Sequence, residues 1–205
     1  MIAVIDYGMG NLHSVRHAFD LLGAEVVVTR DPTTIRAAER VVLPGVGAFG
    51  ECVKNLEAAG LRQVLEAVVL GEGKPFLGIC LGLQVLAREG EEFGRHPGLG
   101  WLPGVVRRLE APGLRLPHVG WNEVLPQVEA PLFRGLGSAP CFYFVHSYCF
   151  QTEDPRLVAA TCDYGGPFTA AVLWRNIFAT QFHPEKSQEV GLQLLENFLD
   201  WEPVC

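Results

Sequence analysis

Short apolar runs alternate with helix-compatible stretches along the first 80 residues of the chain. Short runs of mostly apolar residues are typical of strands buried on both faces. They cover residues 2–6, 24–29, 41–43 and 76–79. The stretches between them predict helices at residues 11–22, 33–38 and 52–70, the first ending at Gly23 and the last interrupted at Gly60. This alternation predicts parallel strands with helices on both faces of the sheet.

The pattern changes between residues 90 and 140, where proline and glycine are frequent and strand-like runs are short. Antiparallel strands joined by loops are predicted there, at residues 105–109 and 119–124. Further strands are predicted at residues 141–145, 157–161, 169–175 and 177–182, and a final helix at residues 188–201. We therefore expect one α/β domain over residues 1–205. It is a three-layer fold with a mostly parallel central sheet flanked by helices and an antiparallel extension in the second half.

Composition narrows the possible function classes. Of the 205 residues, 49% are apolar and 19% are charged, which excludes a disordered chain. A net charge of −7 gives no electrostatic basis for binding nucleic acid. The chain opens on a predicted strand and has no apolar run of membrane-spanning length, so we expect a cytoplasmic protein with no membrane partner. Its six cysteines show no Cys-x-x-Cys spacing, which argues against a zinc site or a dithiol pair.

The most informative segment lies where the apolar run at residues 76–79 ends at Cys80. Glycines stand two residues before and two residues after this cysteine, at Gly78 and Gly82, and a helix-compatible stretch follows at residues 83–88. This is the pattern of a nucleophile elbow with sulfur in place of oxygen. The glycines admit a sharp turn against close backbone, and a helix N-terminus favours the thiolate. Taken alone, the segment also fits a buried structural cysteine.

A candidate partner follows the predicted strand at residues 177–182, in the sequence His183-Pro184-Glu185. The residue before a proline is pushed toward extended backbone, where side chains two positions apart project to the same side. His183 and Glu185 are therefore expected to face one way. A carboxylate beside an imidazole fixes its tautomer and supports its positive charge. In isolation the segment fits a surface loop; together with Cys80 it predicts a Cys-His-Glu triad.

The apolar run at residues 41–43 leads into a loop that contains three glycines and a proline. Such loops can point backbone N–H groups at the oxyanion that forms when a nucleophile attacks an amide. Residues 45–50 have the spacing Gly-x-Gly-x-x-Gly, which alone is a weak signal for phosphate binding, and no Gly-Lys-Ser/Thr follows as in a P-loop. We expect the N–H groups of Val46 and Leu81 to form an oxyanion hole, with Gly45 and Gly47 shaping the loop.

In their order along the chain, these three segments resemble the class I glutamine amidotransferases, which release ammonia from glutamine. Three further blocks make the resemblance narrower. They are Asp-Tyr-Gly-Met-Gly-Asn-Leu-His-Ser-Val at residues 6–15, His-Val-Gly-Trp-Asn at residues 118–122 and Tyr-Phe-Val-His-Ser-Tyr at residues 143–148. With them, essentially the whole chain is similar to the glutaminase subunits of imidazole glycerol phosphate synthases, which act in histidine biosynthesis.

The resemblance implies a division of labour between two proteins. A glutaminase of this family hydrolyses glutamine to glutamate and ammonia with no metal or organic cofactor. It passes the ammonia to a separate (β/α)₈-barrel cyclase subunit, with which it forms a heterodimer. The cyclase makes imidazole glycerol phosphate and aminoimidazole carboxamide ribotide. By the same resemblance, Gln84, His146 and Ser147 are expected to contact glutamine, and Trp121, Tyr143, Lys186 and Asn11 are expected to meet the cyclase.

Three other readings stay open at this point. The chain could be another stand-alone glutaminase, such as the subunit that feeds pyridoxal phosphate synthase, although residues 6–15 and 120–122 argue against it. It could be a non-catalytic binding subunit, but neither Cys80 nor His183 is lost. A γ-glutamyl hydrolase could use the same triad, and would be expected to act without any partner.

Overall fold

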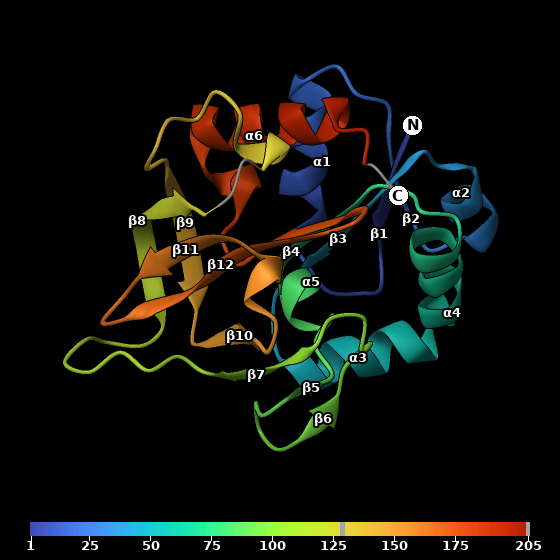
Figure 1. Ribbon diagram of the computed structural model, residues 1–205. Coiled ribbons are helices and arrows are strands. Elements are labelled where there is room, and N and C mark those ends of the chain that lie inside the picture. The colour runs from blue at the N-terminus through green and yellow to red at the C-terminus, as the bar shows by residue number, and fades with distance from the viewer. Residues whose placement is uncertain (128–129, 204–205) are drawn as a thin grey trace.

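The computed structural model describes residues 1–127 and 130–203, and a nine-stranded mixed sheet runs through its middle (Figure 1). The strands follow the order β2-β1-β3-β4-β13-β12-β11-β8-β9. Their bounds are β1 Ile2–Ile5, β2 Val26–Thr29, β3 Arg40–Gly45, β4 Phe76–Cys80, β8 His118–Pro126, β9 Cys141–His146, β11 Val158–Asp163, β12 Pro167–Trp174 and β13 Ile177–Thr180. The strands from β2 to β13 in this order are parallel, and those from β12 to β9 are antiparallel to their neighbours.

Strand β4 lies at the centre of the parallel half, between β3 and β13. Its last residue, Cys80, is opposite Gly45 of β3, and Ile79 is opposite Thr180 of β13. The carboxyl ends of the three strands therefore meet at one edge of the sheet, where ligands bind in open α/β folds. The chain segments that follow these strands carry the predicted oxyanion loop, the elbow and the His-Pro-Glu turn.

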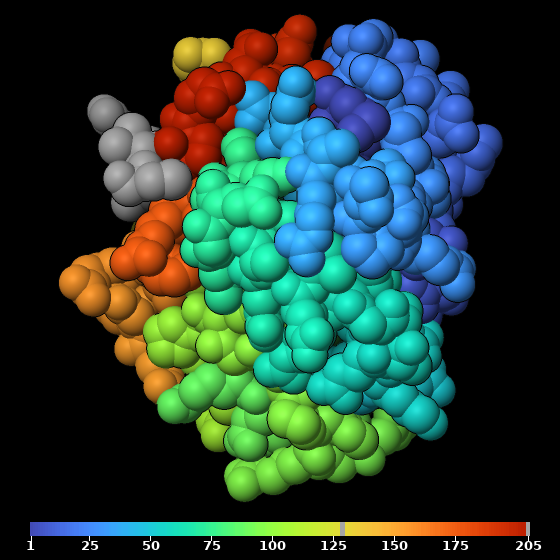
Figure 2. All heavy atoms as spheres, turned by 90° about the vertical axis from the view of Figure 1, so that its right-hand side faces the viewer, coloured from blue at the N-terminus to red at the C-terminus, as the bar shows by residue number. Residues whose placement is uncertain are grey.

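Helices cover both faces of the sheet and divide the core in two. Alternate residues of β1 belong to different clusters, Ala3 and Ile5 to one and Ile2 and Val4 to the other. Helices α1 (Leu12–Leu21) and α6 (Gln188–Asp200) lie on one face, and α2 (Pro32–Ala37), α3 (Phe49–Ala58), α4 (Leu61–Leu65) and α5 (Leu81–Gln84) on the other. At one side of the molecule α2 and α4 lie together, as Figure 2 shows. The predicted three-layer α/β architecture is confirmed.

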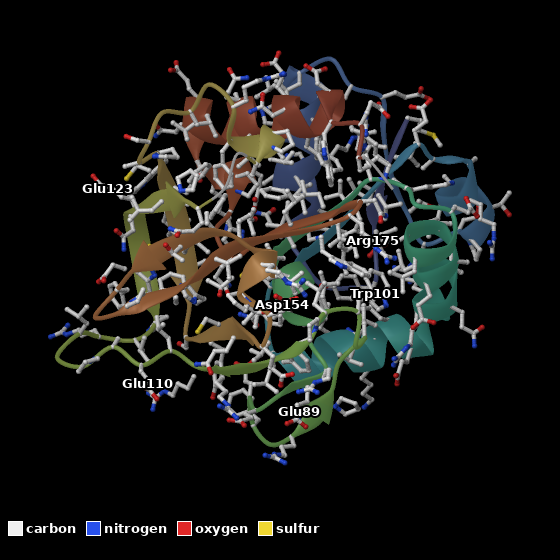
Figure 3. All side chains as sticks on the ribbon, viewed as in Figure 1. Glu89, Trp101, Glu110, Glu123, Asp154 and Arg175 are labelled. Carbon is white, nitrogen blue, oxygen red and sulfur yellow. The ribbon has the colours of Figure 1, made fainter. Side chains whose placement is uncertain are left out.

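A second, four-stranded sheet packs beside the first, in the order β10-β7-β5-β6. Its strands are β5 Glu89–Gly90, β6 His96–Pro97, β7 Gly104–Arg108 and β10 Tyr148–Thr152. Figure 3 labels Glu89 on β5 of this sheet and Glu123 on β8 of the larger one. Strand β10 was not predicted. Only Ser147 separates it from β9, so the chain crosses from one sheet to the other within a single turn.

Several predicted boundaries differ from the structure. The helix after Cys80 begins at Leu81 and ends at Gln84, because the chain then turns to pair as β5. The helical stretch of residues 52–70 begins at Phe49 and ends in a π-helical turn, Glu66–Gly71. Short 3₁₀ turns occur at Pro131–Phe133, Pro155–Leu157 and Pro184–Lys186. Within the described residues, no helix is long and apolar enough to cross a membrane.

Candidate active site

Cys80 occupies a strained backbone position at the junction of β4 and α5. Its φ of 55° and ψ of −104° lie where non-glycine residues are rare, and such positions cost about 1–3 kcal/mol. The turn is tight enough to exclude side chains on either side. A Cβ on Gly82 would lie 1.9 Å from the carbonyl oxygen of Leu43, and one on Gly78 would lie 2.7 Å from that of Gly82. Gly82 thus allows the elbow to pack against β3, and Gly78 allows the start of α5 to pack against β4.

We expect Gly82→Ala to lower the free energy of unfolding by about 3 kcal/mol or more, because the added methyl group overlaps backbone that cannot move independently. Gly71→Ala is the matched control, since its Cβ would have no neighbour nearer than 3.9 Å. Urea denaturation of both variants measures the difference. Equal stability of the two variants would show that the backbone contact at Gly82 is not limiting.

His183 and Glu185 form a buried pair. The Nδ1 atom of His183 lies 2.8 Å from Oε1 of Glu185, and each side chain is 1% exposed. The backbone N–H of His183 donates to the carbonyl of Tyr143 at 2.9 Å. The Ser187 hydroxyl donates to the carbonyl of His183 at 2.6 Å and accepts from the N–H of Tyr143 at 3.0 Å. Strand β9 therefore holds the His-Pro-Glu turn in place, and Ser187 is a supporting residue that the sequence did not indicate.

The electrostatics of this pair favour a charged imidazole. Burial lowers the pKa of His183, but the negative charge of Cys80 and the charged, hydrogen-bonded carboxylate of Glu185 outweigh this effect and raise the pKa to about 10. Among the described residues, Nε2 of His183 has no hydrogen-bond partner that competes for its proton. An imidazolium beside a thiolate is the arrangement that activates a cysteine nucleophile.

The predicted oxyanion loop connects β3 to α3. A Cβ on Gly45 would meet the Tyr7 hydroxyl at 2.6 Å and the Cβ of Leu81 at 2.7 Å, so this glycine permits the loop and the elbow to touch. The Tyr7 hydroxyl donates to the carbonyl of Pro44 at 2.9 Å. Tyr7 therefore anchors the start of the loop, a role that the sequence did not indicate. Beyond it Val46 is 39% exposed, and Gly47 has a φ of 112°, a backbone conformation that favours glycine.

A cavity of about 310 Å³ opens on the Cys80 elbow. Its walls come from the oxyanion loop, the elbow, the turn between β9 and β10, and two charged side chains. The lining residues are Val46, Gly47, Cys80, Leu81, Gln84, Glu92, Val145, His146, Ser147, Tyr148 and Lys186. Two larger hollows, of about 560 and 590 Å³, contain none of the predicted triad. No cluster of three potential metal ligands occurs in residues 1–127 and 130–203.

The residues expected to contact glutamine all line this cavity, but they differ in what they can offer. Both ring nitrogens of His146 are engaged, by His118 at 3.0 Å and by the Tyr148 carbonyl at 2.9 Å, so only its backbone side is left for a ligand. The amide nitrogen of Gln84 is also engaged within the protein. Glu92, which the sequence did not indicate, brings a carboxylate to the cavity and accepts from the N–H of Phe49 at 2.9 Å.

Three of the residues expected to meet a partner lie together near the cavity. Trp121 is 47% exposed, and its ring contacts that of Tyr143 edge-on with 6.2 Å between centroids. The Lys186 ammonium lies 5.8 Å from the centre of the Tyr143 ring. Asn11 has a structural role, because its side chain caps α1 by accepting from the N–H of Ser14 at 3.3 Å.

A family model described as glutamine amidotransferase class-I matches residues 3–201. The chain belongs to this family. Full-length relatives make the assignment narrower. The chain is 52% identical over 209 residues to the imidazole glycerol phosphate synthase subunit HisH of Syntrophotalea carbinolica, covering 98% of this chain and 100% of the relative. The HisH subunit of Nitrosomonas europaea is also 52% identical, over 98% of this chain and 99% of the relative. The family resemblance read from the sequence is confirmed.

Solved structures of class I amidotransferases have the same fold at much lower identity. A structure described as a glutamine amidotransferase superposes with a TM-score of 0.76 at 20% identity, covering 98% of each chain. PurLQS from Thermotoga maritima superposes with a TM-score of 0.74 at 20% identity, covering 97% of each chain. At this identity the likeness supports the fold alone.

Proposed function

We propose that this amidotransferase chain is the glutaminase subunit of an imidazole glycerol phosphate synthase, and that Cys80, His183 and Glu185 carry out the hydrolysis. The observation that carries the proposal is that Cys80 and His183 stand at the carboxyl ends of the neighbouring strands β4 and β13. The strained elbow at the end of β4 presents Cys80, and the turn after β13 presents His183 already bound to Glu185 at 2.8 Å. A thiolate paired with an oriented imidazolium is suited to attack an unactivated amide.

The reaction proceeds in two halves. The Cys80 thiolate attacks the side-chain amide carbon of glutamine, and the carbonyl oxygen becomes an oxyanion. His183 donates its proton to the amide nitrogen, so that the C–N bond breaks and ammonia leaves a thioester on the sulfur. Water then loses a proton to His183 and attacks the thioester, the C–S bond breaks, and glutamate departs. Glu185 stabilises the imidazolium at each proton transfer.

The backbone N–H groups of Val46 and Leu81 are the proposed oxyanion donors. Leu81 is the first residue of α5, where N–H groups have no partner within the helix. Val46 lies between Gly45 and Gly47 and lines the same cavity. Loss of one oxyanion donor typically costs on the order of a hundredfold in rate. The substrate's ammonium group is proposed to face Glu92, the acidic side chain of the cavity wall, next to the backbone of His146 and Ser147.

The ammonia is proposed to pass to a cyclase subunit docked at the surface formed by Trp121, Tyr143 and Lys186. Ammonia in bulk water is protonated and loses its nucleophilicity, so a protected path to a second site is required. Lys186 lines the cavity that contains Cys80, and its ammonium lies 5.8 Å from the centre of the Tyr143 ring, which supports docking of the partner near the nucleophile. Partly exposed tryptophan and tyrosine side chains are frequent anchors of protein interfaces.

Glutamine hydrolysis is expected to be weak in the isolated chain and to rise when a cyclase subunit with bound ligand docks. The two glycines around Val46 allow the peptide to present either its N–H or its carbonyl to the oxyanion, and a partner that favours one state shifts their populations. Glutamate release is measured for the purified chain, for the complex and for the ligand-bound complex. Full turnover without any partner would instead indicate a γ-glutamyl hydrolase or an ungated glutaminase.

A further inference from the structure

A run of hydrogen bonds among buried side chains ends at the sulfur of Cys80. The amide nitrogen of Gln181 lies 3.6 Å from Sγ of Cys80, within hydrogen-bond range for sulfur. The Oε1 atom of Gln181 accepts from Nε2 of Gln84 at 3.0 Å, and the same Nε2 donates to the carbonyl of Tyr148 at 2.9 Å. Gln181 is fully buried, and Gln84 is 4% exposed. The triad mechanism uses neither amide.

The Tyr148 carbonyl determines how both amides must be oriented. A carbonyl oxygen can only accept, so the atom of Gln84 that faces it must be the nitrogen. The second hydrogen of that nitrogen then points at Gln181, so the side-chain oxygen of Gln181 must be the acceptor. The nitrogen of Gln181 is thereby turned toward Cys80. A donor that cannot rotate away is thus held against the nucleophile.

The same Tyr148 carbonyl also accepts from His146, whose ring is in turn fixed by His118. Nδ1 of His146 donates to this carbonyl at 2.9 Å, so in a neutral ring Nε2 of His146 carries no proton. That nitrogen accepts from Nδ1 of His118 at 3.0 Å. Nε2 of His118 is then the acceptor that faces the side-chain nitrogen of Asn122 at 3.4 Å. Asn122 is itself fixed, since its nitrogen also donates to the Asp163 carbonyl at 2.8 Å.

This pattern requires both histidines to be neutral, because a second proton on either ring would place two N–H groups opposite each other. Their surroundings supply that condition. Burial lowers the pKa of His118 to about 4 and that of His146 to about 4. The ring of His118 is stacked between Tyr164, at 4.0 Å between centroids, and Phe144, at 4.8 Å. The pair is therefore locked in one tautomer at neutral pH.

We propose that Gln181 stabilises the Cys80 thiolate through its amide N–H, and that Gln84, His146 and His118 are positioning residues that hold this donor in place through the Tyr148 carbonyl. The inference rests on Cys80 being the nucleophile of the proposed function. A hydrogen bond to a charged acceptor is stronger than one to a neutral thiol, so the contact favours the reactive form. It also leaves Nε2 of His183 free to serve the substrate.

Alkylation of Cys80 by iodoacetamide, followed peptide by peptide with mass spectrometry, tests the donor directly. Gln181→Glu keeps the oxygen that faces Gln84 but places a second oxygen against the sulfur, and it should slow alkylation by more than tenfold. Gln181→Met removes the donor and should slow it by roughly two- to tenfold. Asn197→Leu is the control: Asn197 is also a buried amide, but it donates to the Leu132 and Arg134 carbonyls.

The outcomes separate the two levels of the proposal. If wild-type Cys80 reacts no faster than the exposed Cys141, Cys80 is not an activated nucleophile and the proposed function fails. If Cys80 is reactive, and a folded Gln181 variant alkylates at the rate of wild type or is slowed no more than Asn197→Leu, the donor role is overturned while the triad survives. Either Gln181 variant suffices if the other does not fold.

The role of the histidines, at the end of the hydrogen-bond run farthest from Cys80, is tested by two substitutions of His118. The side-chain nitrogen of an asparagine takes the place of Nδ1, so His118→Asn should keep the donor to His146 and retain alkylation and kcat near wild type. His118→Leu should lower both by roughly two- to tenfold, with a smaller change in KM, because the orientation of Tyr148 loosens. Equal alkylation rates in the two variants would show that the histidines do not hold the Gln181 donor in place.

Discussion

Replacing Cys80 with alanine is expected to lower glutaminase turnover by roughly four orders of magnitude or more, because no other group can form the thioester. Cys80 is the one cysteine among the described residues that lines the cavity, and it is placed there by a backbone conformation that a non-glycine residue adopts at a cost. Glutamate release by the variant, in complex with a cyclase and its ligand, measures the loss. Binding of the cyclase should be unchanged.

The reagent that identifies the thiol is an electrophilic glutamine analogue such as a diazo-oxo-norleucine, which should modify a single cysteine. Cys141→Ser is the matched control, since Cys141 is exposed on β9 and absent from the cavity lining, so full activity is expected. Cys52, Cys149 and Cys162 are buried, and burial raises the pKa of each thiol to about 12, so none should react. Cys205 lies outside the described residues. Modification of any cysteine other than Cys80 would falsify the assignment.

Substitution of the other two triad members should separate their roles. His183→Ala removes the proton carrier and should approach Cys80→Ala in severity. Glu185→Gln keeps the shape but not the charge, and a fall of about 10²- to 10⁴-fold is expected. Wild-type activity in His183→Ala would exclude this triad. Ser187→Thr is a milder comparison, because threonine keeps the hydroxyl that links the turn to β9.

The pH profile of kcat/KM gives a second readout of Glu185. The active pair contains protonated His183, so activity should be lost as pH rises through the pKa of this residue, which is raised to about 10. The Glu185 carboxylate is one cause of that increase. Without its charge, the pKa of His183 should fall, and the basic limb of the profile should move to lower pH. A basic limb that stays in place would mean that Glu185 orients the imidazole without supporting its charge.

The parts of the fold that follow from local patterns were predictable. Short apolar runs indicate buried parallel strands, and for this reason β1, β3 and β4 were predicted near their observed bounds. Strand β10 was missed because Tyr148–Thr152 follows β9 after one residue and continues its run, so nothing in the sequence marks the change of sheet. The short α5 was misplaced because pairing of Glu89–Gly90 with β7, a tertiary contact, ends the helix early.

In the candidate site, too, residues marked by their local sequence were predicted, whereas contacts that depend on the fold were not. Cys80 and the His183–Glu185 pair each lie in a segment whose local sequence carries the chemistry. Gln181 lies only two residues before His183, but its contact with Cys80 spans 101 residues, and neither amide orientation can be read without the Tyr148 carbonyl. Asn11, whose contact with a partner stays a prediction, also caps a helix, a role that its position before an amphipathic run would have allowed.

The position of β4 in the sheet also bears on how the chain is made. Strands β1 to β4 leave the ribosome first and can pair with one another, whereas β13, the second neighbour of β4, is synthesised near the end. Until then one edge of the strand that carries Cys80 is open, and an open edge invites pairing with other chains. Over the same interval His183 does not exist, so the nascent thiol is not yet activated. A reactive cysteine therefore appears only when the last strand closes the sheet.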